Sequence, residues 1–267
     1  MKTAFIAAFL LLRAAPASAG DDMRHGAQAP VASAAAAAVD PDVMARAAAD
    51  KLYNDSLYPQ AASAYEDLLR SQPGDPYLLY NAGNAQFRVK RPGRALLYYA
   101  RAWRMLPRNS DMRYNLDFAL KSTGQSLVPE GVPPFLHRLY YSASDREIAA
   151  LASLAFWALC LLGAGAALRP ALKDRLLPAA GAAAGLLLFF GAWGAARLSA
   201  PLRNAAVVVQ HEAVLRSGPN ETFNAYATLP EGRVVRILDD SRDDFWEVGV
   251  QKEGIKGWIT RDELERI

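Results

Sequence analysis

Cysteine and histidine are almost missing from this chain, which holds one cysteine and three histidines in 267 residues. A single cysteine, Cys160, excludes an intrachain disulfide and a zinc site built from four cysteines. The histidines, His25, His137 and His211, lie far apart in the sequence, which disfavours a histidine metal centre. No nucleophile, base or metal set can be named from the sequence, so we predict that the chain is not an enzyme and takes no cofactor.

Charged residues are missing from two windows of 21 residues, 148–168 and 176–196. Each window is long enough to cross the hydrocarbon core, which needs about 20 residues of helix. The two windows therefore predict a transmembrane helical hairpin joined by residues 169–175. Three basic residues lie in that loop and two near the outer end of each window, so the positive-inside bias puts the loop in the cytoplasm. The windows hold no aspartate, glutamate, lysine, arginine or histidine, which disfavours a transporter or channel.

The first 39 residues have the composition of an export signal and a tether. Residues 1–19 combine Lys2, an apolar stretch and the small-residue sequence Ala17-Ser18-Ala19, which is typical of a signal peptide. Residues 20–39 are rich in alanine without a hydrophobic period, which favours a tether. A signal followed by two spans predicts a bacterial inner-membrane protein with both termini in the periplasm or outside the cell.

A period of 34 residues runs through residues 42–121. Ala61, Tyr65 and Pro73 recur as Ala95, Tyr99 and Pro107, and the pair Tyr80-Asn81 recurs as Tyr114-Asn115. Each unit predicts a pair of helices that ends at proline. The first helix is expected to open at Asp40-Pro41, with the aspartate as N-cap, and residues 110–121 are expected to form a third opening helix that acts as a cap.

The second unit resembles the tetratricopeptide repeat, whose small, alanine, aromatic, small and proline positions match Gly83, Ala95, Tyr99, Ala102 and Pro107. The resemblance implies an all-α repeat domain over residues 40–125, with a protein-binding concave face on the first helix of each unit. That face would hold Arg46, Asp50, Tyr53, Asn54, Tyr77, Tyr80, Asn84, Phe87, Arg88, Tyr114 and Phe118. Aromatic rings and arginine are usual anchors of protein interfaces. The family's clamp for a peptide carboxylate has asparagine where Asp50 stands.

Basic side chains dominate residues 76–107, which hold six of them and no acidic one. Residues 205–267 hold 12 acidic and eight basic side chains. A surface of one sign attracts partners of the opposite sign. The candidates are an acidic protein, anionic lipid head groups and this protein's own C-terminal domain, whereas nucleic acid is disfavoured outside the cytoplasm.

Residues 126–147 form a proline-containing, aromatic connector, of the composition expected at the membrane head-group level.

The pattern after residue 205 changes to short runs with period two, separated by turn residues. Strands are expected at 207–209, 213–216, 234–238, 245–250 and 257–260, which predicts a small all-β barrel. The order of Val214 to Pro219, Leu229 to Gly232, Phe245 to Val248 and Gly257 to Ile259 resembles the bacterial SH3-like domain. Trp246 and Trp258 either line a groove for a peptide or wall glycopeptide, or pack the barrel core and its rim.

The arrangement of signal, repeats, two spans and a C-terminal SH3-like domain resembles the BatE proteins of the aerotolerance operon. This resemblance implies membrane partners with von Willebrand A domains, an indirect link to a MoxR-type cytoplasmic ATPase, and an envelope-stress or oxygen-tolerance role. Two functions remain open from the residues. The chain is either a membrane-anchored protein-interaction scaffold or an anchor whose SH3-like domain holds peptidoglycan.

Overall fold

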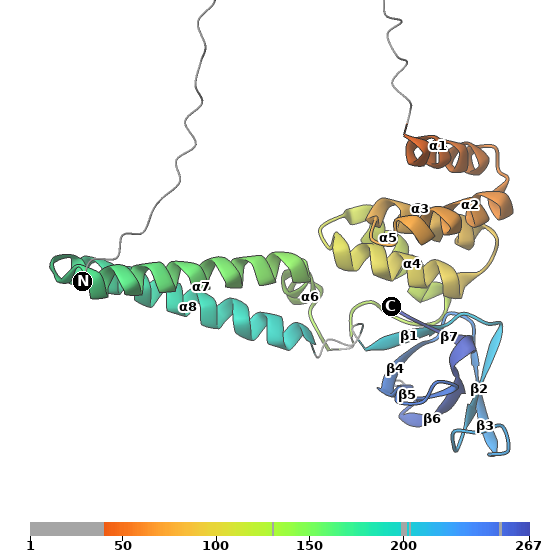
Figure 1. Cartoon of the computed structure of the whole chain (residues 1–267). Coiled ribbons are helices and arrows are strands. Elements are labelled where there is room, and N and C mark those ends of the chain that lie inside the picture. The colour runs from red at the N-terminus through yellow and green to blue at the C-terminus, as the bar shows by residue number, and fades with distance from the viewer. Residues whose placement is uncertain (1–39, 130, 199–201, 203, 251–252) are drawn as a thin grey trace, which may run out of the picture. The chain divides into compact units, whose positions relative to one another are not determined.

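The computed structural model describes residues 40–129, 131–198, 202, 204–250 and 253–267 (Figure 1). The signal peptide and tether expected over residues 1–39 lie outside these ranges. Helices, two of them long and apolar, come first along the described chain, and an antiparallel sheet follows. This order confirms a multidomain chain with a helical region and a C-terminal all-β region.

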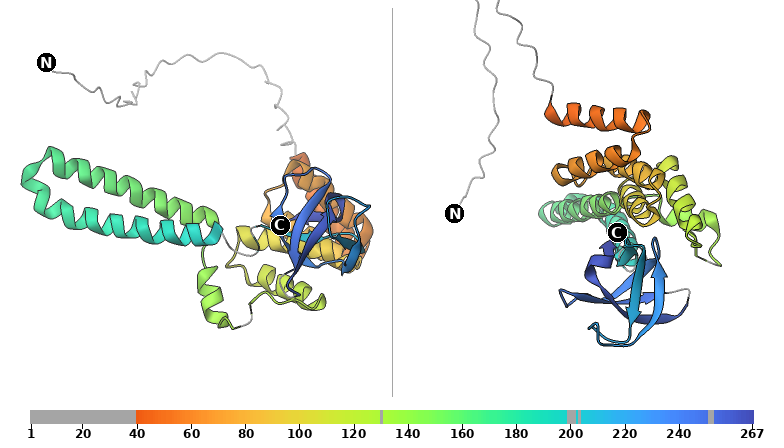
Figure 2. Two further views of the ribbon diagram at one scale, coloured as in Figure 1. Left: turned by 90° about the horizontal axis from the view of Figure 1, so that it is seen from below. Right: turned by 90° about the vertical axis from the view of Figure 1, so that its right-hand side faces the viewer.

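The first five helices of the described chain are called the helical region from here on. Neighbours in sequence among them pack against each other (Figure 2). They are α1 Pro41–Asn54, α2 Tyr58–Ser71, α3 Pro76–Arg88, α4 Pro92–Met105 and α5 Ser110–Ser122. Asp40 accepts a hydrogen bond from the Asp42 amide at 3.0 Å, which confirms the expected N-cap before Pro41. Ser56 and Lys90, 34 residues apart, have φ angles of 62° and 61°, so the period of the sequence recurs in the backbone.

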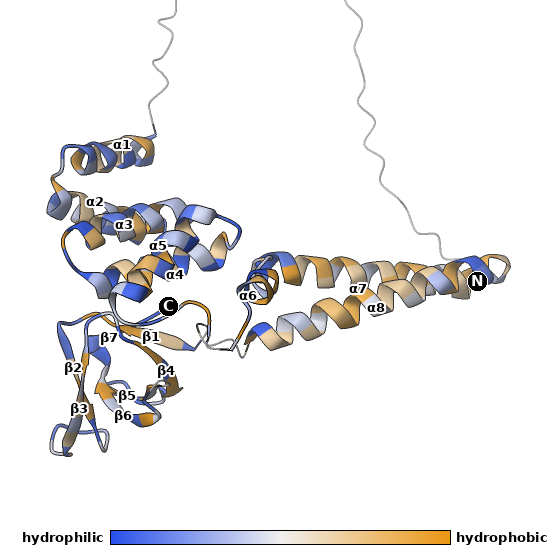
Figure 3. Ribbon diagram, turned by 180° about the vertical axis from the view of Figure 1, so that it is seen from behind, coloured by the Kyte–Doolittle hydropathy of each residue, from blue (hydrophilic) through white to orange (hydrophobic). Residues whose placement is uncertain are grey.

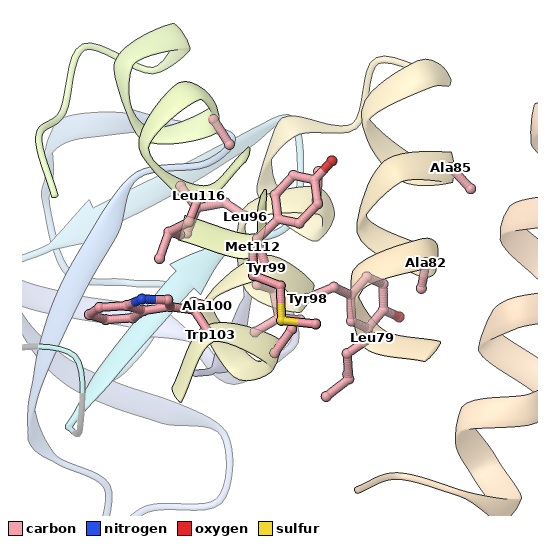
Figure 4. Close-up of a cluster of buried hydrophobic side chains, with 14 of the residues drawn as sticks. Leu79, Ala82, Ala85, Leu96, Tyr98, Tyr99, Ala100, Trp103, Met112 and Leu116 are labelled. Carbon is pink, nitrogen blue, oxygen red and sulfur yellow. The ribbon is translucent and has the colours of Figure 1, made fainter. Parts of the chain in front are cut away.

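The core of the helical region lies where α3, α4 and α5 meet (Figure 4). The facing sides of α3 and α4 are buried, at Leu79, Ala82, Gly83, Ala95, Tyr99 and Ala102. Gly83 sets the spacing of α3 and α4, because a Cβ atom there would lie 2.7 Å from the Tyr99 ring. Alanine and glycine on these faces therefore bring the helix backbones close together.

Helix α6, Pro134–Tyr140, lies within the connector and precedes the helical hairpin of α7, Asp145–Leu168, and α8, Lys173–Leu198. Both hairpin helices are long and apolar enough to cross a membrane (Figure 3). Between the two helices, Pro170–Leu172 form a 3₁₀ helix, whose first position tolerates proline, and α8 begins at Lys173.

A buried arginine joins the start of α7 to the end of α8. Arg197, only 4% exposed, pairs with Asp145 at 2.9 Å and donates hydrogen bonds to the carbonyl oxygens of Tyr140 and Ala143. Ser144 caps α7, since its hydroxyl accepts from the Glu147 amide. The ends of the two helices opposite the turn are thus held by charge-assisted contacts.

The C-terminal domain is one antiparallel sheet with the strand order β3-β2-β6-β5-β4-β1-β7. The strands are β1 Ala205–Val208, β2 Glu212–Arg216, β3 Ala225–Pro230, β4 Val234–Asp239, β5 Phe245–Val250, β6 Ile255–Thr260 and β7 Leu264–Arg266. The five strands expected from the sequence are present, whereas β3 and β7 were not expected. Both lie at edges of the sheet. Of the residues of β3 only Leu229 is buried, so the strand lacks the alternation that reveals a half-buried strand.

Side chains of the sheet complete the core beneath α4. Ala205, Val207 and Ile267 belong to the same buried cluster as the α4 side chains. Arg101 donates to the carbonyl oxygen of Arg266 at 3.1 Å, and Arg104 donates to that of Ile267 at 2.7 Å. Two of the six basic residues of the second unit therefore contact the protein's own C-terminal domain.

Candidate functional site

A small polar pocket lies between α1, α2 and α3. It has a volume of about 260 Å³ and is lined by Asp50, Tyr53, Asn54, Tyr65, Asn81 and Asn84. The Asp50 carboxylate is held by two donors, since the Tyr65 hydroxyl lies 2.6 Å and the Asn81 amide nitrogen 3.3 Å from the same oxygen, Oδ1. Burial raises the pKa of Tyr65 well above its ordinary value and Asp50 raises it further, so this hydroxyl stays a donor.

A row of hydrogen bonds continues from the pocket to α5. The Asn84 side-chain oxygen accepts from the Tyr99 hydroxyl at 2.8 Å and from the Asn115 amide nitrogen at 3.0 Å. The same amide nitrogen of Asn115 lies 3.0 Å from the Tyr80 hydroxyl. Burial raises the pKa of Tyr99 as well. Asn84 and Tyr80 are therefore fixed by neighbours on α4 and α5.

Next along α3 and α5 lies an aromatic patch formed by Phe87, Tyr114 and Phe118. The Phe87 and Phe118 rings meet edge to face with centroids 5.5 Å apart, and Tyr114 stacks on Phe118 at 6.4 Å. Tyr114 is 69% exposed and Phe118 51%. These rings keep a fixed mutual geometry while they present apolar surface to the solvent, which is the arrangement of an interface anchor.

The remaining residues expected on the concave face are engaged elsewhere or stand apart. Arg46 forms an ion pair with Asp75, the N-cap of α3. Arg88 lies 4.4 Å above the ring of Tyr58 and donates to its hydroxyl. Tyr77 is 55% exposed and does not line the pocket. The structure thus brings Tyr53 and Asn84 into the pocket and Phe87, Tyr114 and Phe118 into the patch, and it holds the two arginines in contacts within the chain.

Sequence reasoning missed three polar groups of this site, on Tyr65, Asn81 and Asn115. Tyr65 entered the sequence analysis only as a position of the repeat; its ring is buried, and its hydroxyl reaches the pocket. The signal for the two asparagines was in the repeat, because Tyr80-Asn81 recurs 34 positions later as Tyr114-Asn115. An amide conserved between two repeats on a packed helix indicates a hydrogen-bonding role.

The two tryptophans of the sheet differ in position. Trp246 is 7% exposed and belongs to the core of the sheet, with the Arg266 guanidinium 4.8 Å from its ring centre. Trp258 is only partly buried, and Arg242 lies 5.8 Å from its ring centre. The structure therefore places Trp246 in the core, and of the two rings only that of Trp258 exposes part of its surface to solvent.

The part of the chain that the structure describes contains no group of three or more histidine, cysteine, aspartate or glutamate residues able to hold a metal ion. No protein-family model matches the chain, and a comparison with curated proteins finds no match either. The pocket and the aromatic patch are thus interpreted from their own geometry.

Proposed function

We propose that this protein is a membrane-anchored, periplasmic protein-interaction scaffold whose repeats, of the tetratricopeptide type, bind a segment of a partner protein. The aromatic patch beside the polar pocket carries the proposal. Both features lie on the opening helices of successive units, where this repeat type binds its ligands. Exposed rings clustered beside polar groups mark interaction sites more often than scattered exposed rings do.

The anchor in this proposal is the hairpin of α7 and α8. Its length and hydropathy support two spans, and the basic residues of the turn support a cytoplasmic turn. The helical region and the sheet would then lie on the same side of the inner membrane, where their contacts through α4 can form. The aromatic connector helix α6 would lie at the lipid head groups.

The order of the modules supports a place in a Bat-type envelope-stress or aerotolerance complex. In that case the partners are membrane proteins with von Willebrand A domains, and a MoxR-type ATPase acts on the far side of the membrane. The patch would supply the contact to such a partner, because its exposed rings provide the apolar area that a specific interface needs.

A wall anchor is the second candidate, and the partly exposed ring of Trp258 is the observation in its favour. The charge of the domain opposes it, because residues 205–267 have a net charge of minus four. A wall rich in carboxylate and phosphate would repel such a domain, most strongly at low salt.

Capture from solubilised membranes tests the scaffold. The full chain with Tyr114→Ala and Phe118→Ala should lose most of a captured von Willebrand A membrane protein. Loss of two anchoring rings typically costs about 2 kcal/mol or more, which is roughly a 30-fold change in affinity. The control is the full chain with Val43→Ala and Met44→Ala. It removes apolar side chains that are 57% and 60% exposed on α1 and that lie outside pocket and patch. Equal capture by both double variants would refute a role for the aromatic patch.

A further inference from the structure

Asp50 presents a negative charge in the pocket without a cation to balance it. Among the described residues, no lysine, arginine or histidine forms a salt bridge with this carboxylate. The basic residues nearest to it on α1, Arg46 and Lys51, are paired with Asp75 and Asp55. Arg88 of α3 is held on Tyr58. The chain thus has basic side chains around the pocket, but each of these is engaged with a different partner.

The donors around Asp50 fix the carboxylate without neutralising it. Tyr65 and Asn81 both donate to Oδ1, and a hydroxyl and an amide supply hydrogen bonds but no charge. A partly buried carboxylate held in this way attracts a cation more strongly than an exposed one does, because the surrounding medium screens less. The site is therefore complementary to a positive group.

The size of the pocket limits what that group can be. Sites for whole small-molecule ligands typically have about 300–1,000 Å³, and this pocket has about 260 Å³. It lies just below that range and has room for a single side chain. A Ca²⁺ ion would require six or more oxygen ligands, usually with several carboxylates, whereas Asp50 is the only carboxylate in the lining.

We propose that the Asp50 pocket binds one basic side chain, lysine or arginine, of the partner segment that the aromatic patch holds. The inference rests on the proposed function and adds the chemistry of the partner. The carboxylate would pair with the ammonium or guanidinium group, the Tyr53 ring would supply a cation–π contact, and the side-chain oxygen of Asn54 is a further acceptor. The pocket thus selects a positive group, whereas a carboxylate clamp selects a negative one.

Three capped tripeptides test the proposal on the full chain in lipid nanodiscs. They are acetyl-Ala-Lys-Ala-amide, the same peptide with norleucine in place of lysine, and the same peptide with glutamate. With asparagine labelled selectively with ¹⁵N, the side-chain amide signal of Asn81 reports binding. We expect a saturable shift with the lysine peptide and no shift with the other two.

Two matched variants assign the charge that acts. Asp50→Asn keeps an acceptor for Tyr65 and Asn81 but removes the charge, and it should weaken lysine-peptide binding at least tenfold. Asp67→Asn removes an exposed carboxylate of α2 that lies outside the pocket and pairs with the exposed Arg70, and it should leave the affinity unchanged. Equal helical content of both variants, measured by circular dichroism, shows that the fold is kept.

Several results would overturn the proposal. They are equal shifts with lysine and norleucine, preference for glutamate, unchanged affinity in Asp50→Asn, or saturation of the Asn81 signal by Ca²⁺ or Mg²⁺ alone. None of these results bears on the proposed scaffold function. Partner capture that depends on Tyr114 and Phe118 would still stand, whereas loss of that dependence would refute the scaffold even if the pocket bound lysine.

Discussion

Adding one methyl group at Gly83 should destabilise the packing of α3 on α4. A Cβ atom at this position would lie 2.7 Å from Cδ1 and Cε1 of Tyr99. The ring cannot easily yield, because Tyr99 is 3% exposed and its hydroxyl is bonded to Asn84. We therefore expect Gly83→Ala to push α3 away from α4 and to break that hydrogen bond.

The expected cost follows from three opposing contributions. Overpacking a core typically costs about 1–3 kcal/mol, and the lost hydrogen bond adds about 1 kcal/mol. Alanine in place of glycine within a helix recovers about 1 kcal/mol. The net destabilisation is therefore roughly 1–3 kcal/mol. Gly74→Ala is the control, because no atom lies within 4 Å of a Cβ atom at that turn position.

Hydrogen exchange of the α3 and α4 amides is the suitable assay, since a chain of several domains does not unfold in one step. Protection of these amides should fall roughly 5- to 150-fold in Gly83→Ala and stay within about twofold of the parent in Gly74→Ala. If Gly83→Ala raises protection, as helix propensity alone predicts, then the inference that α3 and α4 pack too closely at Tyr99 for a methyl group is refuted.

Two further predictions concern the C-terminal domain. Glu231 accepts a hydrogen bond from the Gly93 amide at 3.1 Å, and burial raises its pKa in the folded protein. Its contribution to stability is thus fully present below the ordinary glutamate pKa and is lost as pH rises through the raised value. We expect exchange protection of the buried α4 amides to fall over that window in the parent and to stay level in Glu231→Gln; a parallel decline in both proteins would assign the effect to another group. The second prediction separates scaffold from wall anchor, since the negative charge of the domain should prevent firm binding to peptidoglycan. Little of the full chain should sediment with purified peptidoglycan at low salt, where the repulsion is least screened, and sedimentation that survives high salt and is abolished by a folded Trp258→Ala variant would instead support the wall anchor.

The helical part of the fold could be predicted from the sequence because its signals are local and periodic. Asp40-Pro41 marks a helix start by cap chemistry, and the 34-residue recurrence of Tyr65 as Tyr99 marks two equivalent packing positions. The edge strands β3 and β7 could not be found in the same way. Their side chains are mostly exposed or too few to show an alternation, so pairing with a neighbouring strand decides their structure.

The site was predictable as a face but not as a set of contacts. Helical periodicity places Tyr53, Asn84 and Phe118 on opening helices, but it does not say which polar atoms meet. Long side chains show the limit most clearly, because Arg46 reaches Asp75 across 29 residues of sequence and Arg88 reaches Tyr58 across 30. Such partners follow from the distance between helices, which the packing of residues such as Gly83 determines.

The ion pair of Arg197 and Asp145 has a consequence for how the hairpin responds to the thickness of the bilayer. In the proposed two-span arrangement, paired charges at one end and the basic turn at the other cannot enter the hydrocarbon cheaply. In a thinner bilayer the hairpin would therefore tilt, and it would not slide along the membrane normal. Because the pair joins α7 to α8, both helices would tilt as one body. Lipid composition would then alter the angle at which the hairpin leaves the membrane.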